Sequence, residues 1–480
     1  MNLKHKTFTA VRWTTAATGI RTLIQLAQVS ILARLLLPTD YGLMAIVSVV
    51  LAFAGIFSDG GLNSAYVQRQ NVSNEERSSL FWLNIFTSCS LTALLIILSP
   101  LFAIWFQDPR LSFILMLSAT TFIIGALGQQ IRMNAEKRLD FKVLMIAEST
   151  AALIGLIVAI STASYGLGVY SLVWGGLSNT ASSSTLAWIF LAKGWRPQWH
   201  FCLADLRGYL GFGVSLMSNN LVNEINRNID LLLGGRMLSS AALGLYSLPR
   251  QFVFQIQGAV NPIVTRVGFP LIAQVQSDIP AVRAIYLKTL NLTSSINAPI
   301  YISIAFFAPE IIYILLGEQW ISATQILRLL AIWGLFRSIG NPVGSLLLGM
   351  GRADLSLKWN LMLLLVVPPL LWITSKNGTL GIAWGLLGFS CVIFVPTWYV
   401  LVRPLCHAKF REYCVAALRP PLLALTSIIP AFWIMGQFDG PLPRLMIASL
   451  VASPLYLIVS YTFNRDWTTS MYELIKSGRS

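Results

Sequence analysis

Residues 41–57 of the chain read YGLMAIVSVVLAFAGIF, and residues 91–106 read LTALLIILSPLFAIWF, with no charged side chain in either run. Further apolar runs follow at 151–160, 361–373 and 443–460. All are continuous, whereas a strand of a membrane barrel would alternate apolar and polar residues. Because a bilayer offers no water to pair the backbone, such runs predict membrane-spanning helices.

The composition of the whole chain agrees with this interpretation. The 480 residues are 55% hydrophobic and only 11% charged, whereas soluble domains carry roughly a quarter charged residues. We therefore predict an all-α polytopic membrane protein with about fourteen transmembrane helices. The expected helices lie near residues 9–35, 41–66, 78–104, 111–134, 141–162, 166–192, 207–235, 241–266, 285–313, 321–349, 357–375, 379–402, 416–436 and 443–463.

Lys and Arg are concentrated in every second segment between these helices. The rich set includes the N-terminus, 67–78, 132–142, 193–207 and the C-terminal segment after residue 463. By the positive-inside rule, these segments and both termini are expected in the cytoplasm. The net charge of +15 then reflects orientation and not nucleic-acid binding. No phosphate-binding Gly-x-x-x-x-Gly-Lys-Ser/Thr loop is present, so an ATPase would have to be a separate chain.

A short internal repeat suggests how the helices are grouped. The stretch 33–36, ARLL, with Gly42 eight residues after its arginine, resembles 235–238, GRML, with Gly244 eight residues after its own. The offset is about six helices, and an even number gives parallel repeats. We expect a six-helix lobe at 1–200, a second at 207–402, and an additional helix pair at 416–463.

Two of the expected helices carry polar stripes. Arg21, Gln25 and Gln28 have the i, i+4, i+7 spacing that puts side chains on one helix face. The seventh helix carries a second polar stripe, with Asp230 at its edge, formed by Asn220, Asn223, Glu224 and Arg227. A charge at the bilayer centre costs about 2.5–3.5 kcal/mol, so intramembrane ionisable residues are functional candidates.

Four more ionisable residues fall inside expected helices: Asp59, Glu148, Arg250 and Arg337. Each also has a purely structural interpretation. Asp59 precedes two glycines and could end a helix, and Glu148 could neutralise a neighbouring arginine. Glu224 and Arg227 are close enough along their helix to pair with each other.

The excess of arginine predicts an anionic ligand, because guanidinium groups bind phosphate bidentately and stay charged in a low-dielectric cavity. The three histidines, His5, His200 and His407, all lie in expected cytoplasmic segments. Without an acid–base constellation in one pocket, we predict no catalytic residues, no cofactor and no metal site. The sequence therefore favours transport over enzymatic chemistry.

At this point the chain resembles a known family, the bacterial polysaccharide exporters or oligosaccharide-lipid flippases, of the colanic-acid exporter type. The resemblance covers most of the chain. It is carried by ARLL at 33–36 with DYG at 40–42, GQQ at 128–130 with Arg132, NPIVTR at 261–266 with Phe269-Pro270, GEQW at 317–320, and LFRSIGNPVGS at 335–345 with Gly351-Arg352.

The resemblance implies a fold shared with multidrug MATE transporters and the lipid II flippase. It implies that the protein moves undecaprenyl-diphosphate-linked oligosaccharide repeat units across the bacterial inner membrane by alternating access, for exopolysaccharide or lipopolysaccharide biosynthesis. A membrane polysaccharide polymerase is the partner protein that it suggests.

The candidate residues are then expected to have three roles. Arg21, Arg227, Arg250 and Arg337 would hold the diphosphate or acidic sugars, and Gln25, Gln28, Asn220 and Asn223 would bond sugar hydroxyls. The final helix pair would flank the prenyl tail. An ion gradient, of protons or of sodium, would drive turnover through Asp59, Glu148, Glu224 or Asp230.

Two rival functions use a similar hydropathy profile. A MATE-like multidrug or cation antiporter would share the fold, but an arginine-rich lumen would repel its cargo, and that class usually has twelve helices. A polysaccharide polymerase or ligase usually carries a sizeable periplasmic loop with catalytic residues, and no such loop is expected here.

Overall fold

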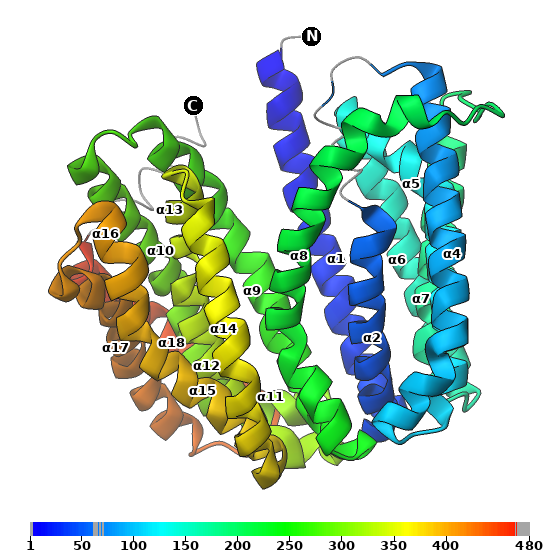
Figure 1. Cartoon of the computed structure of the whole chain (residues 1–480). Coiled ribbons are helices and arrows are strands. Elements are labelled where there is room, and N and C mark those ends of the chain that lie inside the picture. Colours follow the sequence, from blue (N-terminus) through cyan, green and yellow to red (C-terminus); the bar gives the residue numbers. More distant parts are fainter. Residues whose placement is uncertain (1–2, 61–65, 67–68, 70–71, 466, 468–480) are drawn as a thin grey trace. The chain divides into compact units, whose positions relative to one another are not determined.

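The computed structural model describes residues 3–60, 66, 69, 72–465 and 467. Within these, the side chains of residues 3–17, 59, 204, 207, 208, 210–216, 218, 219 and 263–267 are not described. Every regular element of the described chain is a helix (Figure 1). The chain divides into two compact units, Met1–Gly244 and Leu245–Ser480.

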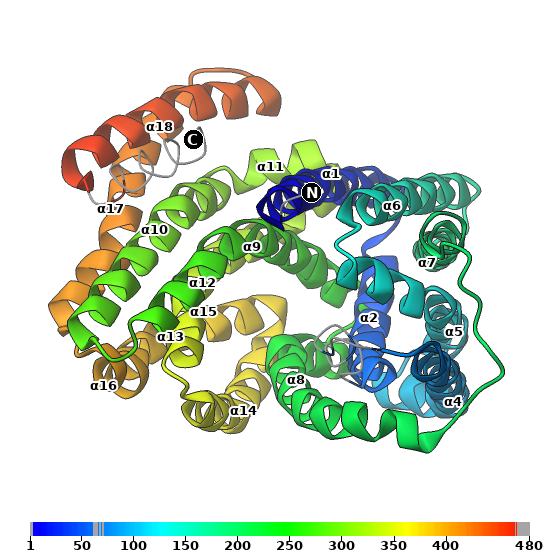
Figure 2. The same cartoon turned by 90° about the horizontal axis from the view of Figure 1, so that it is seen from above.

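The first unit is a bundle of long helices. Neighbouring helices of this unit lie side by side, with α6 against both α1 and α7, and α5 against both α4 and α7 (Figures 1 and 2). The helices are α1 (Leu3–Leu35), α2 (Pro38–Asp59), α4 (Asn74–Phe106), α5 (Arg110–Lys137), α6 (Phe141–Ser164), α7 (Tyr170–Leu191), α8 (Leu203–Met237) and the first turn of α9 (Ser240–Gln274).

Local capping determines where several of these helices begin and end. The backbone N–H of Leu37 donates to the Asp40 carboxylate over 3.0 Å at the start of α2, and Ser73 Oγ accepts the N–H of Glu76 over 3.0 Å at the start of α4. Gly60 ends α2 in the left-handed region, with φ of 52°. The helix expected over 41–66 is therefore shorter than predicted.

The second unit contains several interrupted helices. The expected helix 285–313 is bent by 82° between α10 and α11, and the expected helix 321–349 is two helices, α12 and α13. The helices are α10 (Ile279–Phe306), α11 (Ala308–Leu315), α12 (Thr324–Gly340), α13 (Pro342–Gly349), α14 (Ala353–Thr374), α15 (Gly378–Pro396), α16 (Arg403–Cys406), α17 (Phe410–Met435) and α18 (Pro441–Phe463).

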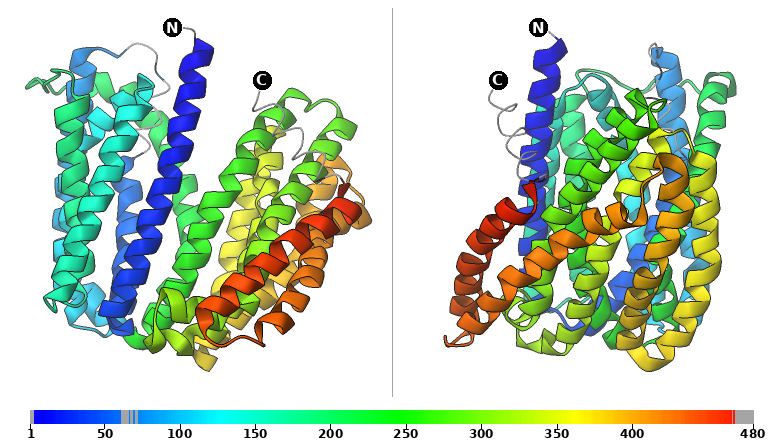
Figure 3. Two further views of the ribbon diagram at one scale, coloured as in Figure 1. Left: turned by 180° about the vertical axis from the view of Figure 1, so that it is seen from behind. Right: turned by 90° about the vertical axis from the view of Figure 1, so that its left-hand side faces the viewer.

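The last two helices, α17 and α18, lie side by side (Figure 3) and are bonded to α10. Ser294 Oγ donates to the carbonyl of Ala417 over 2.7 Å, and Tyr456 Oη donates to the carbonyl of Ser295 over 2.8 Å. In membranes, hydrogen bonds between helices stabilise helix association. They attach the pair expected at 416–463 to the rest of its unit.

The protein is an all-helical polytopic membrane protein. Within the described part of the chain, seven helical segments are long and apolar enough to cross a membrane, or eight if α10 and α11 together form one bent span. One of the seven, Ala353–Cys406, contains both α14 and α15, which pack against each other. Helices with polar stripes, such as α8, do not reach the same mean hydropathy, because their charged residues lower it.

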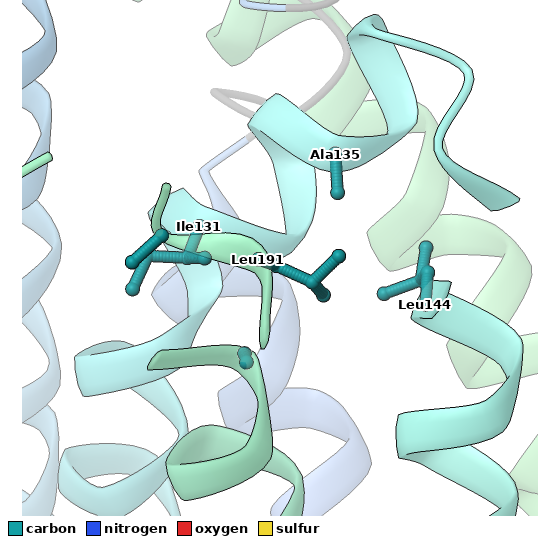
Figure 4. Close-up of a cluster of buried hydrophobic side chains, with 6 residues drawn as sticks. Ile131, Ala135, Leu144 and Leu191 are labelled. Carbon is teal, nitrogen blue, oxygen red and sulfur yellow. The ribbon is translucent and has the colours of Figure 1, made fainter. Parts of the chain in front are cut away.

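Small residues allow close contact inside the first unit. A Cβ atom on Gly155 of α6 would lie 2.8 Å from the carbonyl oxygen of Gly175 on α7, which is the close backbone approach typical of membrane helices. At one end of the same helices, Ile131 and Ala135 of α5 pack with Leu144 and Leu191 (Figure 4).

The two glycines of the internal repeat touch each other. A Cβ atom on Gly42 would lie 1.8 Å from the carbonyl oxygen of Ser240, and one on Gly244 would lie 1.7 Å from that of Pro38. Pro38 and Ser240 each precede their glycine by four residues, so the contact is reciprocal. Such a reciprocal contact is the one expected when a two-fold axis relates the two helix starts. The starts of α2 and α9 therefore cross at the two glycines.

The crossing is reinforced by a polar contact beside it. Ser240 Oγ donates to Asp108 Oδ2 over 3.0 Å, and Arg110 Nη2 donates to the same carboxylate over 2.8 Å. The hydrogen bond from Arg110 lowers the pKa of Asp108, so this carboxylate stays ionised and continues to accept the serine hydroxyl.

Candidate functional site

The first polar stripe lies on α1, and one of its members forms an ion pair. Arg21 pairs with Glu148 of α6 through Nη2 and Oε2, and their side chains are 35% and 23% exposed. Gln25 is exposed and Gln28 is half-buried on the same helix. The structure thus pairs Arg21, predicted to bind cargo, with Glu148, predicted to couple transport to an ion. The same contact is expected if Glu148 neutralises a neighbouring arginine.

The second stripe lies on α8. Asn220, Asn223 and Arg227 are exposed, whereas Asp230 is buried, with 3% of its surface exposed. Glu224 accepts a hydrogen bond of 2.6 Å from Nδ2 of Asn228. The sequence-based prediction did not include Asn228, although it lies four residues from Glu224 on the same helix.

In the second unit, two of the predicted arginines share one aromatic ring. Arg250 of α9 has its Cζ 4.5 Å from the ring centroid of Phe254, and Arg337 of α12 has its Cζ 5.0 Å from the same centroid. Arg337 also lies 5.5 Å from the ring of Trp333. Arg250 is 6% exposed. Cation–π contacts of this kind stabilise a guanidinium away from water.

The remaining candidates are distributed unevenly between the units. All of the predicted residues up to Asp230 belong to the first unit, whereas Arg250 and Arg337 belong to the second. The side chain of Asp59 lies outside the described residues. The structure therefore brings together two pairs of predicted residues: Arg21 with Glu148, and Arg250 with Arg337.

An apolar groove of about 580 Å³ runs over α2, α4 and α8 in the first unit. Phe57, Phe86, Phe102 and Leu232 are among its lining residues, and its polar members are hydroxyls such as Thr87. Burying sugar hydroxyls or phosphates against such a lining would leave them without hydrogen-bond partners. The groove suits hydrocarbon and is not a site for a charged headgroup.

One charged cluster was missed by the sequence-based prediction. Arg77, in the first turn of α4, is only 5% exposed, and its Cζ lies 3.8 Å from the ring centroid of Trp195. Both residues fall in segments that the charge pattern assigns to the cytoplasm, where a basic residue is ordinary. Nothing in the sequence indicates that Arg77 is buried.

The fold is shared with solved multi-pass membrane transporters. It is similar to the solved structure of the lipid II flippase MurJ in an inward closed conformation, with a TM-score of 0.76 over 95% of this chain and 99% of that one, at 14% identity. It is also similar to an inward-facing multidrug resistance MATE family transporter of the MOP superfamily, with a TM-score of 0.60 over 86% of this chain and 96% of that one, also at 14% identity.

Sequence comparison identifies the family within this class. A family described as "Polysaccharide biosynthesis protein" matches residues 31–325, which is more than half of the chain, and the protein belongs to it. The resemblance noted from the sequence motifs is confirmed.

Full-length relatives support this assignment. Lipopolysaccharide biosynthesis protein WzxC of Escherichia coli (strain K12) is 29% identical over 443 residues, covering 92% of this chain and 90% of the relative. An uncharacterized membrane protein in the cps region of Klebsiella pneumoniae is 31% identical, covering 89% of each chain. Teichuronic acid biosynthesis protein TuaB of Bacillus subtilis (strain 168) is 30% identical, covering 88% of each.

Proposed function

We propose that the protein is a flippase that moves undecaprenyl-diphosphate-linked oligosaccharide repeat units across the bacterial inner membrane for surface polysaccharide biosynthesis. The observation that carries this proposal is the family match over residues 31–325, and the chain is also similar to proteins named for lipopolysaccharide and teichuronic acid biosynthesis. Arginines on the helices supply the cationic surface that a diphosphate needs.

The residues proposed to contact the cargo are taken unit by unit. In the first unit, Arg21 and Arg227 would hold the diphosphate or acidic sugars, and in the second unit Arg250 and Arg337, stacked on Phe254, would do the same. Gln25, Gln28, Asn220 and Asn223 would bond sugar hydroxyls. A MATE-like antiporter for cationic drugs is less well supported, because these guanidinium groups would repel a cation.

The proposed architecture has fourteen spans in two six-helix lobes, 1–200 and 207–402, followed by the pair 416–463, with both termini in the cytoplasm. The reciprocal contact of Gly42 and Gly244 supports two related repeats, and the MurJ-like fold supports an alternating-access transporter. The charge alternation along the sequence supports the orientation.

Deletion of the gene is expected to cause complete lipid-linked repeat units to accumulate and surface polysaccharide to disappear, because synthesis precedes the blocked step. Mass spectrometry of undecaprenyl-diphosphate-linked units and quantification of surface polymer make the test. Unchanged lipid-linked units together with normal polymer, in a strain without a redundant exporter, would point instead to the drug-antiporter function.

In the deletion strain, Arg227→Ala is expected to reduce export about tenfold or more, through loss of a charge-assisted hydrogen bond to the cargo. Arg227→Lys should retain part of the export, because it keeps the charge. Arg236→Ala is the matched control, since Arg236 is exposed at the end of the same helix, with its Cζ 5.9 Å from the ring of Trp105. Normal export by Arg227→Ala at wild-type abundance contradicts the proposed role.

We also propose that a proton or sodium gradient drives turnover, with Asp59, Glu148, Glu224 or Asp230 as the carrier. Collapsing both gradients in transporting vesicles is expected to stop the movement of lipid-linked units across the membrane. Transport that continues undiminished would exclude ion coupling, while the flippase function itself would stand.

A further inference from the structure

Arg77 is a buried cation without a buried anion. Its residue is 5% exposed, and no carboxylate lies within ion-pair distance of it among the described residues. The neighbouring Glu76 is already engaged by Arg69 at 3.7 Å and by the hydroxyl of Tyr209 at 3.2 Å. A buried charge that lacks a counter-charge is costly unless something else compensates it.

The partner that Arg77 does have is a neutral oxygen that it shares with a second arginine. With the Asn134 amide oriented by its hydrogen bonds, Oδ1 accepts from Nη1 and Nη2 of Arg77 at 3.2 and 3.0 Å, and from Nη2 of Arg138 at 3.0 Å. The amide nitrogen then donates to the Tyr66 hydroxyl at 3.2 Å. Three donors from two like charges therefore converge on one amide oxygen.

This donor set suits an anion better than an amide. Guanidinium groups bind phosphate oxygens with charge-assisted, often bidentate bonds, which are roughly twice as strong as neutral ones. An anionic oxygen at the Asn134 Oδ1 position would also relieve the repulsion between Arg77 and Arg138. The Nε atom of Arg77 is buried and has no hydrogen-bond partner, so one more donor is available there.

The site has a closed side and an open side. The ring of Trp195 covers the guanidinium of Arg77 at 3.8 Å, whereas Arg138 is exposed. The nearby acid Asp140 is held by Lys193 at 2.5 Å and does not compete for the arginines. An anion would therefore reach Arg77 from the side of Arg138, by displacing the Asn134 amide.

We propose that Arg77 and Arg138 form a binding site for the phosphate oxygens of a diphosphate or phosphate ester, and that Asn134 occupies this site when no ligand is bound. The site uses neither Arg21 of α1 nor Arg227 of α8, the two arginines predicted to bind cargo in the same unit. It rests on the proposed function in one respect: the charge pattern places this end of α4 and α5 in the cytoplasm, where the diphosphate of a lipid-linked substrate would arrive.

Asn134→Asp tests this site directly. The substitution places a fixed carboxylate against both arginines with almost no change of shape, so it should raise the melting temperature and exclude a second anion. Asn134→Ala is the matched control: it removes the competing amide and leaves both arginines free. Arg138→Gln removes the exposed arginine and leaves the contacts of Arg77 with Asn134 and Trp195 in place.

The binding measurement uses pyrophosphate and the purified full-length protein in phosphatidylcholine nanodiscs at fixed ionic strength. Saturable binding is expected for the wild type and for Asn134→Ala. Binding should be about tenfold weaker or worse in Asn134→Asp and Arg138→Gln. The proposal is overturned if the wild type does not bind pyrophosphate, or if Asn134→Asp binds it as well as the wild type.

Export by the same variants in cells separates two sources of phosphate. If Asn134→Asp loses pyrophosphate binding and lipid-linked units accumulate, the site receives the substrate diphosphate. If it loses binding but exports normally, and phosphatidylglycerol in the nanodiscs competes with pyrophosphate, the site holds a phospholipid headgroup. Failure of the flippase function would appear independently, as unchanged lipid-linked units in the gene deletion.

Discussion

Gly42→Ala and Gly244→Ala are each expected to abolish export and to lower the melting temperature of the purified protein. The added methyl carbon would lie 1.8 Å from the carbonyl oxygen of Ser240 in the first variant, and 1.7 Å from that of Pro38 in the second. Both obstacles are backbone atoms, which cannot rotate away as a side chain could, so the starts of α2 and α9 must move apart. Overpacking of this kind costs about 1–3 kcal/mol or more.

Each variant has a matched control on its own helix. Gly55 of α2 would place its Cβ in ordinary contact with Phe122 at 3.9 Å, and Gly258 of α9 would meet nothing within 4 Å. Gly55→Ala and Gly258→Ala should therefore export normally, and thermal unfolding in detergent should show little change. If Gly42→Ala exports and unfolds like Gly55→Ala, the crossing is not as close as the structure has it.

The double variant tests whether the two glycines share one contact. Once one methyl group has separated the helices, the second should lower the melting temperature much less, because both methyl groups act on the same crossing. The losses of melting temperature should then be clearly less than additive, as is usual for residues in contact. Strictly additive losses of melting temperature would mean that the two glycines act in separate contacts.

The sequence predicts the helices well where apolar runs are uninterrupted. The expected 141–162 is α6, Phe141–Ser164, and the expected 78–104 is the apolar part of α4, Asn74–Phe106. Hydropathy alone does not locate bends, because a bent helix is as apolar as a straight one. The break between α12 and α13 falls at Pro342, which lacks a backbone N–H to continue the hydrogen-bond ladder.

The sequence names candidate site residues but not the contacts between them. The insertion cost of a charge singles out Arg21, Glu148, Arg250 and Arg337 from the sequence. Which of them meet depends on the packing of helices that are distant along the chain, and one sequence does not contain that information. The sequence does not reveal the Arg77 cluster, because an arginine at a membrane boundary is common. Only the fold shows that this arginine is buried.

Arg21→Ala is expected to reduce export about tenfold or more, because it removes a proposed bond to the cargo diphosphate. The ion pair with Glu148 offers a competing explanation, since loss of Arg21 also leaves a half-buried carboxylate without its partner. Breaking one half of a buried pair is destabilising, whereas replacing both halves by neutral groups is often nearly neutral. The single variant does not distinguish these two causes.

The double variant Arg21→Gln with Glu148→Gln separates them. If the pair only holds α1 to α6, the neutral double variant should recover both melting temperature and export. We expect it to recover melting temperature but to remain defective in export, because the cargo still lacks its guanidinium, and Glu148→Gln alone shows whether loss of the candidate ion carrier contributes to that defect. The measurements are thermal unfolding of the purified protein and mass spectrometry of accumulated lipid-linked units. Recovered export would reduce Arg21 and Glu148 to a structural pair and leave the cargo site to Arg227, Arg250 and Arg337.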